Sequence, residues 1–422
     1  MSPKPYKITD GEIPEEWEVV RIGQICEVRT GGTPNTKVRE YYDNGTIRWM
    51  KSADVKGPYI YDVPNRITEK GLANSNAVIH PPGSVMVAMS GRGKTRGMTA
   101  VLSVPSTCSQ SVAAIIPDKE KLVAEFLHYD LQFRYEEIRN ITGSYDRSGL
   151  NLRLIRDIRV PRPSIQEQRK ISDILVATDS AIQKTEGIIA KTQQLKKGLM
   201  QQLLTKGIGH TKFKKTEIGE IPEEWEVVSL GQILLLCQYG LSEPLKEAGK
   251  YAIFRMNNFE DGFVVPSDLK YTNVNVQSFS HFKLEKGDLL FNRTNSYDLV
   301  GKIGIFLLDG DYTFASYLIR LRVDPEKADP FFVNYFLNTE NSHKRLKNLA
   351  TRGVSQTNIN ATNLKTVVVP LPPLAEQKRI AAMISTAQDK ISKERQNREQ
   401  LEQLKKGLMQ VLLTGKVRVK VN

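Results

Sequence analysis

The chain is poor in cysteine and has no long apolar run. Only three of its 422 residues are cysteine, namely Cys26, Cys108 and Cys237. An odd number of widely scattered cysteines argues against a disulfide framework and against zinc-ligand spacing, and it suits a reducing compartment. No stretch approaches the roughly 18 consecutive apolar residues of a membrane span, and residues 1–7 lack the apolar core of a secretory signal. The sequence therefore predicts a cytoplasmic protein.

Several signatures of catalysis are also missing. The sequence has no Gly-x-Gly-x-x-Gly loop, and it has neither Asp-Pro-Pro-Tyr nor Asn-Pro-Pro-Tyr, the aromatic clamp of adenine methyltransferases. Its five histidines, at positions 80, 128, 210, 281 and 343, lie far apart in the sequence. We therefore expect no catalytic residue, no metal site and no bound cofactor in this chain.

One segment comes close to a phosphate-binding loop. Residues 85–95 read as a strand followed by Ser-Gly-Arg-Gly-Lys-Thr. The pattern Gly-x4-Gly-Lys-Thr requires glycine at position 88, where this chain has Ala88, and alanine does not readily adopt the positive φ of such a loop. A polar loop that contacts DNA is the favoured interpretation, and a nucleotide-binding enzyme that uses residues 88–95 is a weaker alternative.

Positive charge is in excess. The chain has 60 lysines and arginines against 47 aspartates and glutamates, for a net charge of +13, and its pI is about 9.4. A balance of this kind favours a polyanionic partner, most simply nucleic acid.

The most informative feature is an internal repeat. Residues 12–20 and 220–228 both read Glu-Ile-Pro-Glu-Glu-Trp-Glu-Val-Val, and residues 195–201 and 404–410 both read Leu-Lys-Lys-Gly-Leu-Met-Gln. The first pair is displaced by 208 residues (12 to 220) and the second by 209 (195 to 404). A period this long indicates two whole domains rather than a solenoid. Because the segments between the matching blocks barely agree, the chain has two copies of one scaffold with two different recognition surfaces.

Each copy has a variable globular part, at about 11–160 and 220–370. Short β-like runs bounded by glycine and proline occur at 84–89, 112–116, 288–291 and 317–323, and one helix is expected near the end of each part, at 122–140 and 330–349. Extended runs that proline stops, at 157–163 and 366–373, close the two parts. We predict an α+β (α/β) fold with a curled sheet, and we expect the repeated Trp17 and Trp225 to be packing anchors.

A long helix follows each globular part, at about 164–206 and 373–415. Apolar or small residues recur with alternating steps of four and three from Ile171 to Thr192, and a phase slip then leads to Leu195, Leu199 and Leu203. The second helix has Ile380, Ile384, Ala387 and Ile391, then Leu401, Leu404, Leu408 and Leu412, with Glu394 and Arg398 interrupting the pattern. A period of 3.5 predicts a coiled coil. We expect the two helices to pair antiparallel within the chain, each roughly 60 Å long.

These residues carry a resemblance to a known family. The segment Pro-Leu-Pro-Pro-Leu-Ala-Glu-Gln-Lys-Arg-Ile at 370–380 and its counterpart at 161–171 resemble the specificity subunit of type I restriction–modification systems. The paired Leu-Lys-Lys-Gly-Leu-Met-Gln blocks, the two Gly-Glu-Ile-Pro-Glu-Glu-Trp blocks and Gly-Gly-Thr-Pro at 31–34 also resemble that family. The resemblance covers essentially the whole chain.

The resemblance implies a DNA-recognition subunit without catalytic activity. It implies target recognition domains at 1–160 and 210–370, each specific for half of a bipartite DNA site, with a central conserved helix at 161–209 and a distal helix and tail at 371–422. It also implies assembly with two DNA adenine methyltransferase subunits and with motor–nuclease restriction subunits. Those partners are expected to bind S-adenosylmethionine, ATP and magnesium. A stand-alone DNA-binding regulator with two recognition domains is the alternative.

Polar clusters in the loops of the variable parts are the candidates for DNA contact. Arginine suits guanine and asparagine or glutamine suits adenine, whereas most protein–DNA contacts go to the backbone. The candidates in the first domain are Thr33, Lys37, Arg48, Lys51, Ser90, Arg92, Lys94, Arg96, Ser144 and Arg147. Those in the second are Arg255, Asn257, Asn258, Arg293, Asn295, Ser296, Arg352, Ser355, Gln356 and Asn358.

Overall fold

The structure, a computed structural model, describes residues 13–91, 93–141, 149–352 and 357–421, with only the backbone of Arg352. It divides into two compact units. Unit 1 comprises Met1–Gly187 and Arg395–Asn422, and unit 2 comprises Ile188–Glu394. Each unit therefore contains one globular part together with a segment of each long helix. Within the described ranges, no helix is both long enough and apolar enough to span a membrane.

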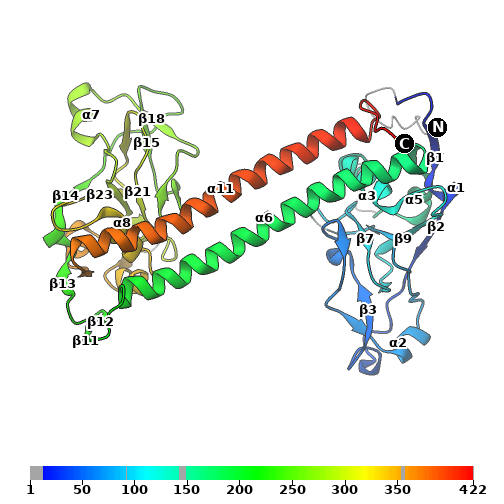
Figure 1. Cartoon of the computed structure of the whole chain (residues 1–422), viewed down its shortest axis with the longest axis horizontal. Helices are drawn as coiled ribbons and strands as arrows, with labels where there is room; N and C mark the ends of the chain where they lie inside the picture. The colour runs from blue at the N-terminus through cyan, green and yellow to red at the C-terminus, as the bar shows by residue number, and fades with distance from the viewer. Residues whose placement is uncertain (1–12, 92, 142–148, 353–356, 422) are drawn as a thin grey trace. The chain divides into compact units, whose positions relative to one another are not determined.

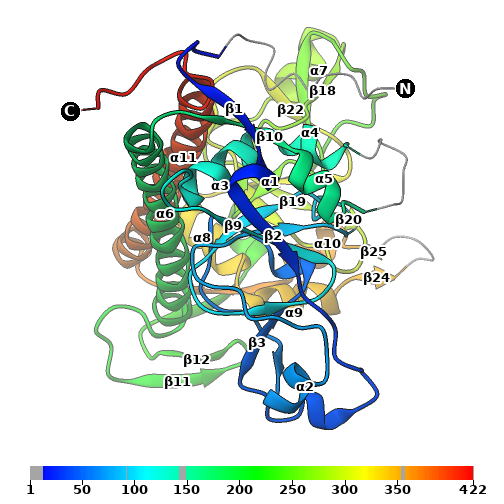
Figure 2. The ribbon, with the colours of Figure 1, turned by 90° about the vertical axis from the view of Figure 1, so that its right-hand side faces the viewer.

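Short strands and helices make up the globular part of unit 1, and the first long helix follows it. In chain order they are β1 (Glu18–Arg21), α1 (Ile22–Ile25), β2 (Cys26–Thr30), η1 (Arg39–Tyr41), β3 (Ile47–Met50), η2 (Ser52–Asp54), β4 (Tyr59–Ile60), β5 (Arg66–Ile67), α2 (Glu69–Ala73), β6 (Val85–Ala88), β7 (Thr99–Leu102), β8 (Thr107–Cys108), β9 (Val112–Pro117), α3 (Ala124–Phe133), α4 (Tyr135–Arg139), α5 (Leu152–Asp157), β10 (Arg159–Arg162) and α6 (Ile165–Lys206). Figure 2 shows β2 beside β9, with β3 and α2 at one end of this globular part.

The elements after α6 begin with a hairpin formed by β11 and β12. They are β11 (Phe213–Thr216), β12 (Gly219–Pro222), β13 (Glu226–Ser229), η3 (Leu230–Ile233), β14 (Leu234–Tyr239), β15 (Tyr251–Phe254), β16 (Phe259–Glu260), β17 (Phe263–Val264), β18 (Lys270–Thr272), α7 (Val276–Phe282), β19 (Leu289–Asn292), β20 (Thr294–Asn295), β21 (Ile303–Ile305), β22 (Tyr312–Phe314), β23 (Leu318–Val323), α8 (Pro330–Leu337), α9 (Glu340–Asn348), β24 (Thr351–Arg352), β25 (Thr357–Asn358), α10 (Ala361–Lys365), β26 (Val368–Leu371) and α11 (Leu374–Leu412).

The two globular parts share one sheet topology, which confirms the predicted repeat of one mixed α and β fold. The main sheet has the order β2-β9-β6-β7-β4 in unit 1, and unit 2 has the corresponding order β14-β23-β19-β21-β17, extended by β16. The smaller sheet is β5-β3-β8 in unit 1 and β18-β15-β22 in unit 2. Even the parallel pairs correspond, because β3 runs parallel to β8 as β15 does to β22.

The single helix expected near the end of each globular part is wrong, because each is two helices. Arg134 leaves helical geometry between α3 and α4, and its guanidinium pairs with the buried carboxylate of Asp130. In unit 2, α8 ends at Leu337, and Thr339 caps the N-terminus of α9, since its hydroxyl accepts a hydrogen bond from the backbone N–H of Ser342. A threonine in that position favours a new helix start over continuation.

The long helices pair antiparallel within each unit, as predicted (Figure 1). In unit 1, Glu167 of α6 contacts Arg418, just after α11, and Asp179 of α6 contacts Lys405 of α11. The two helices therefore run in opposite directions. In unit 2, Lys196 contacts Gln388 and His210 contacts Glu376, again in opposite directions.

The predicted phase slip in the helix seam is wrong. Leu195 and Leu404, which were expected to be buried, are 59% and 53% exposed. The alternation of four and three residues continues instead through Lys196 on α6 and Lys405 on α11, both half-buried. Each residue turns an α-helix by about 100°, so the leucine that precedes each lysine faces outward.

A repeated hydrogen-bonded cluster fixes each globular part to its helices. The Trp17 indole donates to Glu167 at the start of α6 (3.2 Å), and the Trp225 indole donates to Glu376 at the start of α11 (3.1 Å). Both tryptophans are buried, as predicted for packing anchors. The next residue after each glutamate, Gln168 or Gln377, bonds backbone groups of the globular part. These equivalent contacts fix the globular part to the helices in the same way in both units. The loops take no part in them and can therefore differ between the units.

Candidate nucleic-acid interface

In unit 1, three of the predicted polar clusters converge at one end of the sheet. Thr33, Lys51 and Ser90 line an open hollow of about 560 Å³. Ser52, directly after Lys51, donates from its hydroxyl to the carbonyl of Ser111 (2.9 Å), and its hydroxyl lies 3.5 Å from that of Ser90. None of the described residues that line the hollow is acidic. The hollow is therefore a polar surface with one cation, suited to a polyanionic ligand.

The floor of this hollow is fixed by close backbone packing. A side chain at Gly31 would place its Cβ 1.8 Å from the carbonyl oxygen of Cys108, so only glycine fits there. The Trp49 indole donates to the carbonyl of Gly32 (2.9 Å), and the Lys51 ammonium lies 5.0 Å from the centre of the Trp49 ring. Thr33, next in the chain, is thereby held against the turn that precedes β9.

The remaining described candidates of unit 1 differ in availability. Lys37 and Lys94 are exposed, and Arg96 is half-buried. The Lys94 carbonyl accepts a hydrogen bond from the Tyr135 hydroxyl (2.7 Å), which anchors the loop. Arg48 forms an ion pair with Asp62 (2.8 Å), so any contact of Arg48 with DNA would compete with that pair.

The near-P-loop is a hairpin connection. β6 and β7 are antiparallel neighbours, and the described residues that join them, 89–91 and 93–98, contain no helix. A phosphate-binding loop needs a helix whose N-terminus faces the phosphates. The geometry of this segment thus removes the basis of the nucleotide-binding alternative.

In unit 2, the predicted clusters also converge. Asn292 donates from its amide to the carbonyl of Met256 (3.4 Å), which joins the loop after β19 to the loop after β15. The strands β20, β25 and β24 form a three-stranded sheet in which residues 357–358 lie between residues 294–295 and residues 351–352. Clusters separated by about sixty residues in the sequence thus form one surface.

Two candidates of unit 2 bond each other. The Arg293 guanidinium donates to the Asn358 side-chain oxygen (3.1 Å) and to the carbonyl of Ser316 (3.3 Å), and it lies 4.8 Å from the centre of the Tyr239 ring. The Asn358 amide donates to the Thr294 hydroxyl (3.1 Å). Arg293 and Asn358 therefore hold the loops together, with less of their bonding capacity left for bases.

The loop after β15 is largely committed to its own turn. Asn258 is fully buried, and its side chain accepts a hydrogen bond from the backbone N–H of Arg255 and donates to the carbonyl of Ser267. The Arg255 guanidinium pairs with Asp268 (2.9 Å). Asn257 and Ser296 are exposed, whereas Asn295 is half-buried and accepts from the backbone N–H of Ser296. Because Asn258 is fully buried, its side chain cannot contact DNA.

Other candidates cannot be placed. Arg92, Ser144, Arg147, Ser355 and Gln356 lie outside the described residues, and Arg352 is described only by its backbone in β24. The flanking backbone still aligns between the units. The N–H of Leu150 donates to the carbonyl of Met89 (2.8 Å), as the N–H of Ile359 does to the carbonyl of Arg293 (2.9 Å). Leu150 therefore bonds the residue that follows β6 in unit 1, as Ile359 bonds the residue that follows β19 in unit 2.

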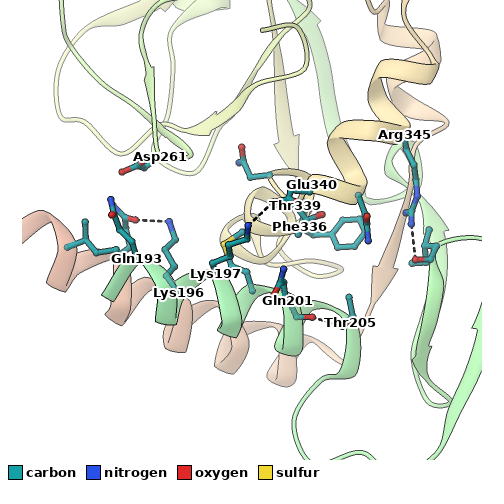
Figure 3. A pocket seen from close by; sticks show the side chains of 16 residues that line it. Gln193, Lys196, Lys197, Gln201, Thr205, Asp261, Phe336, Thr339, Glu340 and Arg345 are labelled. Carbon is teal, nitrogen blue, oxygen red and sulfur yellow. Dashed lines mark hydrogen bonds and ion pairs between the residues drawn. The ribbon is translucent and has the colours of Figure 1, made fainter. Parts of the chain in front are cut away.

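A second hollow lies against the helix in unit 2. This groove of about 590 Å³ is lined by residues of α6, α8 and α9. Figure 3 shows Lys196, Lys197 and Gln201 of α6 on one wall, with Thr339 and Glu340 opposite. Lys197 pairs with Glu340 (2.9 Å), and Arg345 donates to the carbonyl of Ile218 (2.8 Å). Lys197 and Arg345 thus bond groups of the protein itself.

No metal centre is apparent among the described residues, where no group of three or more His, Cys, Asp or Glu side chains has the required arrangement.

Two buried histidines of unit 1 serve packing. Burial lowers the pKa of His80 to about 4 and that of His128 to about 3. His80 contacts the Cys108 thiol (3.3 Å), and burial raises the pKa of that thiol to about 12, so the thiol is not a nucleophile.

The sequence reasoning missed two kinds of residue. Gln110 lines the hollow of unit 1 beside Thr33, but no cluster of charges or glycines marks it in the sequence. Glu167 and Glu376 hold the buried tryptophans, and their repetition six residues after the first proline of each proline-rich run, Pro161 and Pro370, was the signal that could have identified them.

Comparisons with known proteins agree with this architecture. A family model described as the type I restriction modification DNA specificity domain matches residues 14–194 and again residues 222–403. The putative type I restriction enzyme MjaX specificity subunit of Methanocaldococcus jannaschii is 30% identical, with 98% of this chain and 97% of that protein covered. The MjaVIII specificity subunit of the same organism is 29% identical, with 97% and 94% covered. The EcoKI specificity subunit of Escherichia coli is 22% identical, with 89% and 82% covered.

Solved structures share the fold. The crystal structure of a type I restriction–modification S subunit from M. genitalium superposes with a TM-score of 0.61 at 14% identity, covering 99% of both chains. A chain from a study of complex assembly and conformational transition in a type I system gives 0.54 at 20% identity, covering 98% of this chain and all of that one. Because the family model matches both repeats and the relatives align over almost the full length, the chain belongs to the family of type I restriction–modification specificity subunits.

Proposed function

We propose that this chain is the DNA-recognition subunit of a type I restriction–modification complex, with one half of a bipartite site bound by each unit. The observation that carries the proposal is the repeated surface at the loops after β3 and β6 in unit 1 and after β15 and β19 in unit 2. The frame is the same in both, including the Trp17 and Trp225 clusters. The polar side chains on that frame differ, as two different half-sites require.

The proposed contact set is the exposed or half-buried part of the predicted clusters, among the residues that the structure describes. In unit 1 it is centred on the hollow with Thr33, Lys51 and Ser90. In unit 2 it comprises Asn295 and Ser296 at the β20-β25-β24 sheet, together with Asn257. Lysines would contact phosphates and set the position on the duplex, while amides and hydroxyls would contact base edges. The recognition domains at 1–160 and 210–370, with the helices at 161–209 and 371–422, are part of the same proposal.

The proposal extends to the partner subunits. Each unit exposes an equivalent pair of apolar side chains on its long helices, Ile174 with Leu404 in unit 1 and Met383 with Leu195 in unit 2. Exposed apolar residues on paired helices are suited to packing against a partner's helix. One such surface per unit supports the binding of two DNA adenine methyltransferase subunits. Motor–nuclease subunits would then bind to complete the restriction complex. In this proposal the partners supply all catalysis and bind S-adenosylmethionine, ATP and magnesium in the cytoplasm.

The test is the pattern of methylated adenines. Co-expression with the cognate methyltransferase should produce a complex that survives purification, and single-molecule sequencing of the host DNA should show methylation of one bipartite motif. Exchange of residues 220–370 for those of another family member should then change only one half of that motif. A chain that purifies alone and leaves DNA unmethylated would favour the stand-alone regulator, and a change in both halves would contradict modular recognition.

A further inference from the structure

We propose that Gln110 is a specificity-determining residue of unit 1, and that its side-chain amide recognises one adenine in the half-site bound by that unit. The inference rests on the proposed function and adds a residue and a base to it. Gln110 is exposed at the rim of the hollow that Thr33, Lys51 and Ser90 line.

The amide of Gln110 is held in place without being used up. The Thr33 hydroxyl donates to its side-chain oxygen at 2.5 Å. An amide oxygen has a second lone pair, and the amide nitrogen has two N–H donors. One acceptor position and the donors of Gln110 therefore remain for a ligand, while the contact with Thr33 limits the rotation of the side chain.

The backbone that carries Gln110 is also fixed. The neighbouring N–H of Ser109 donates to the carbonyl of Met50 (2.8 Å), and the N–H of Val112 donates to the carbonyl of Ser109 (3.1 Å). The hydroxyls of Ser109 and Ser111 lie 2.7 Å apart, on either side of Gln110. A tight turn thus presents one long amide side chain from the end of a buried strand, which gives the precision that base recognition requires.

The chemistry of the hollow selects a base edge over a phosphate as the partner of Gln110. Lys51 is the only charged residue among the described residues that line the hollow, and it lies over the Trp49 ring. A neutral amide offers one donor beside one acceptor, the pattern that matches the N7 and N6 groups of adenine in the major groove. Guanine presents two acceptors there, so the same amide would leave its oxygen facing another oxygen.

Unit 2 differs at the corresponding position. Ser316 precedes β23 by two residues, as Gln110 precedes β9, and the Ser316 carbonyl accepts a hydrogen bond from Arg293. The serine side chain is too short to bond two groups of one base in the manner of glutamine. The repeat therefore conserves the turn and changes the side chain that it presents, which is the expected behaviour of a position that sets sequence preference.

The test uses the complete methyltransferase complex and maps methylated sites in the host for wild type, Gln110→Ala and the control Gln166→Ala. Gln166 is an exposed glutamine of the same unit, in the first turn of α6. We expect Gln110→Ala to lose discrimination about 5- to 150-fold at one A·T position of one half-site. The other half-site and the Gln166→Ala map should stay as in wild type. An unchanged map for Gln110→Ala, or a loss of discrimination in the other half-site, would overturn the proposal for Gln110. The proposed function would still stand in either case, provided that wild type methylates a bipartite motif. Absence of a bipartite motif in wild type would overturn both.

A binding measurement covers the case in which Gln110→Ala does not assemble. DNA with 7-deazaadenine at the candidate position lacks N7, so it should bind the wild-type complex about tenfold more weakly than unmodified DNA. Gln110→Glu, which keeps the length of the side chain, should bind the two DNAs equally and should gain preference for cytosine, whose amino group donates to a carboxylate. Equal binding of both DNAs by the wild-type complex at every adenine of the half-site would exclude base recognition by Gln110.

Discussion

Unit 1 and unit 2 are alike where the globular part meets the helices and unlike where we expect them to meet DNA. The Trp17–Glu167 and Trp225–Glu376 hydrogen bonds differ by only 0.1 Å (3.2 against 3.1 Å). At the candidate interface, unit 1 has an open hollow with an exposed glutamine, whereas unit 2 has an arginine bonded to its own asparagine. Duplication has kept the contacts that carry packing energy and has changed side chains that pack against little.

Removal of the tryptophans tests the similarity most severely. Trp225→Ala should destabilise unit 2 by about 3–5 kcal/mol, because the indole is fully buried and its removal leaves a cavity and deprives Glu376 of one hydrogen bond. Trp17→Ala should cost unit 1 a similar amount. Urea unfolding followed by hydrogen exchange, which reports the two units separately, measures both values, with the exposed Tyr61→Ala as control. A loss confined to one of the two units would show that the repeated cluster has lost its structural role in the other.

Low pH should destabilise unit 1 through two buried histidines. Burial also lowers the pKa of His343 in unit 2, but in unit 1 it lowers the pKa of both His80, to about 4, and His128, to about 3. These histidines are neutral when folded, and the unfolded chain takes up their protons below about pH 6.5, so stability falls as pH falls. The loss approaches about 1.4 kcal/mol per pH unit for each histidine between pH 6.5 and about 4.

Burial raises the pKa of Asp130 in the same unit, so protonation of Asp130 makes unit 1 more stable as pH falls. The effect of a histidine is therefore measured as the difference in stability between wild type and a variant that lacks it. The stability of wild type minus that of His128→Asn should shrink as pH falls from 7 to 5, because only wild type has this histidine to protonate. Hydrogen exchange in β6 and β7 provides the readout. A difference independent of pH would mean that His128 is not held neutral.

The buried charge pair in the helix seam of unit 1 gives a smaller effect. Lys405 pairs with Asp179 (2.8 Å) where both side chains are largely buried. Lys405→Met should cost about 2 kcal/mol, since it leaves the Asp179 carboxylate without its cation. Denaturant titrations measure this cost, and a loss near zero would show that the Lys405–Asp179 charge pair adds nothing.

The smallest expected effect concerns salt. Lys51 and Arg255 follow the equivalent strands β3 and β15, but Arg255 is paired with Asp268 and Lys51 has no carboxylate lining its hollow. Lys51→Ala should lower the slope of log affinity against log salt by about 0.9, the value for one phosphate contact, and Arg255→Ala should lower it less. Titration of the assembled complex with its DNA site at several salt concentrations measures both slopes. A larger effect of Arg255→Ala would reverse the assignment of the two cations.

The repeat, the two long helices, the main strands and the burial of both tryptophans could be predicted from the sequence. These features depend on local pattern, which means an apolar period, prolines that stop a run, and blocks copied at a displacement of about 209 residues. The near-P-loop was also resolved from the sequence, because Ala88 stands where the pattern needs glycine.

Tertiary structure alone decided which polar residues remain available. Arg293 and Asn358 are 65 residues apart and form a hydrogen bond with each other, and Asn258 is buried in its own turn, although all three resemble base-contacting residues in the sequence. Gln110 has no sequence signature, yet its turn is fixed against β3 and its amide is oriented by Thr33, 77 residues away. Local pattern determines backbone conformation, whereas a polar group's free bonding capacity depends on partners that only the folded chain brings together.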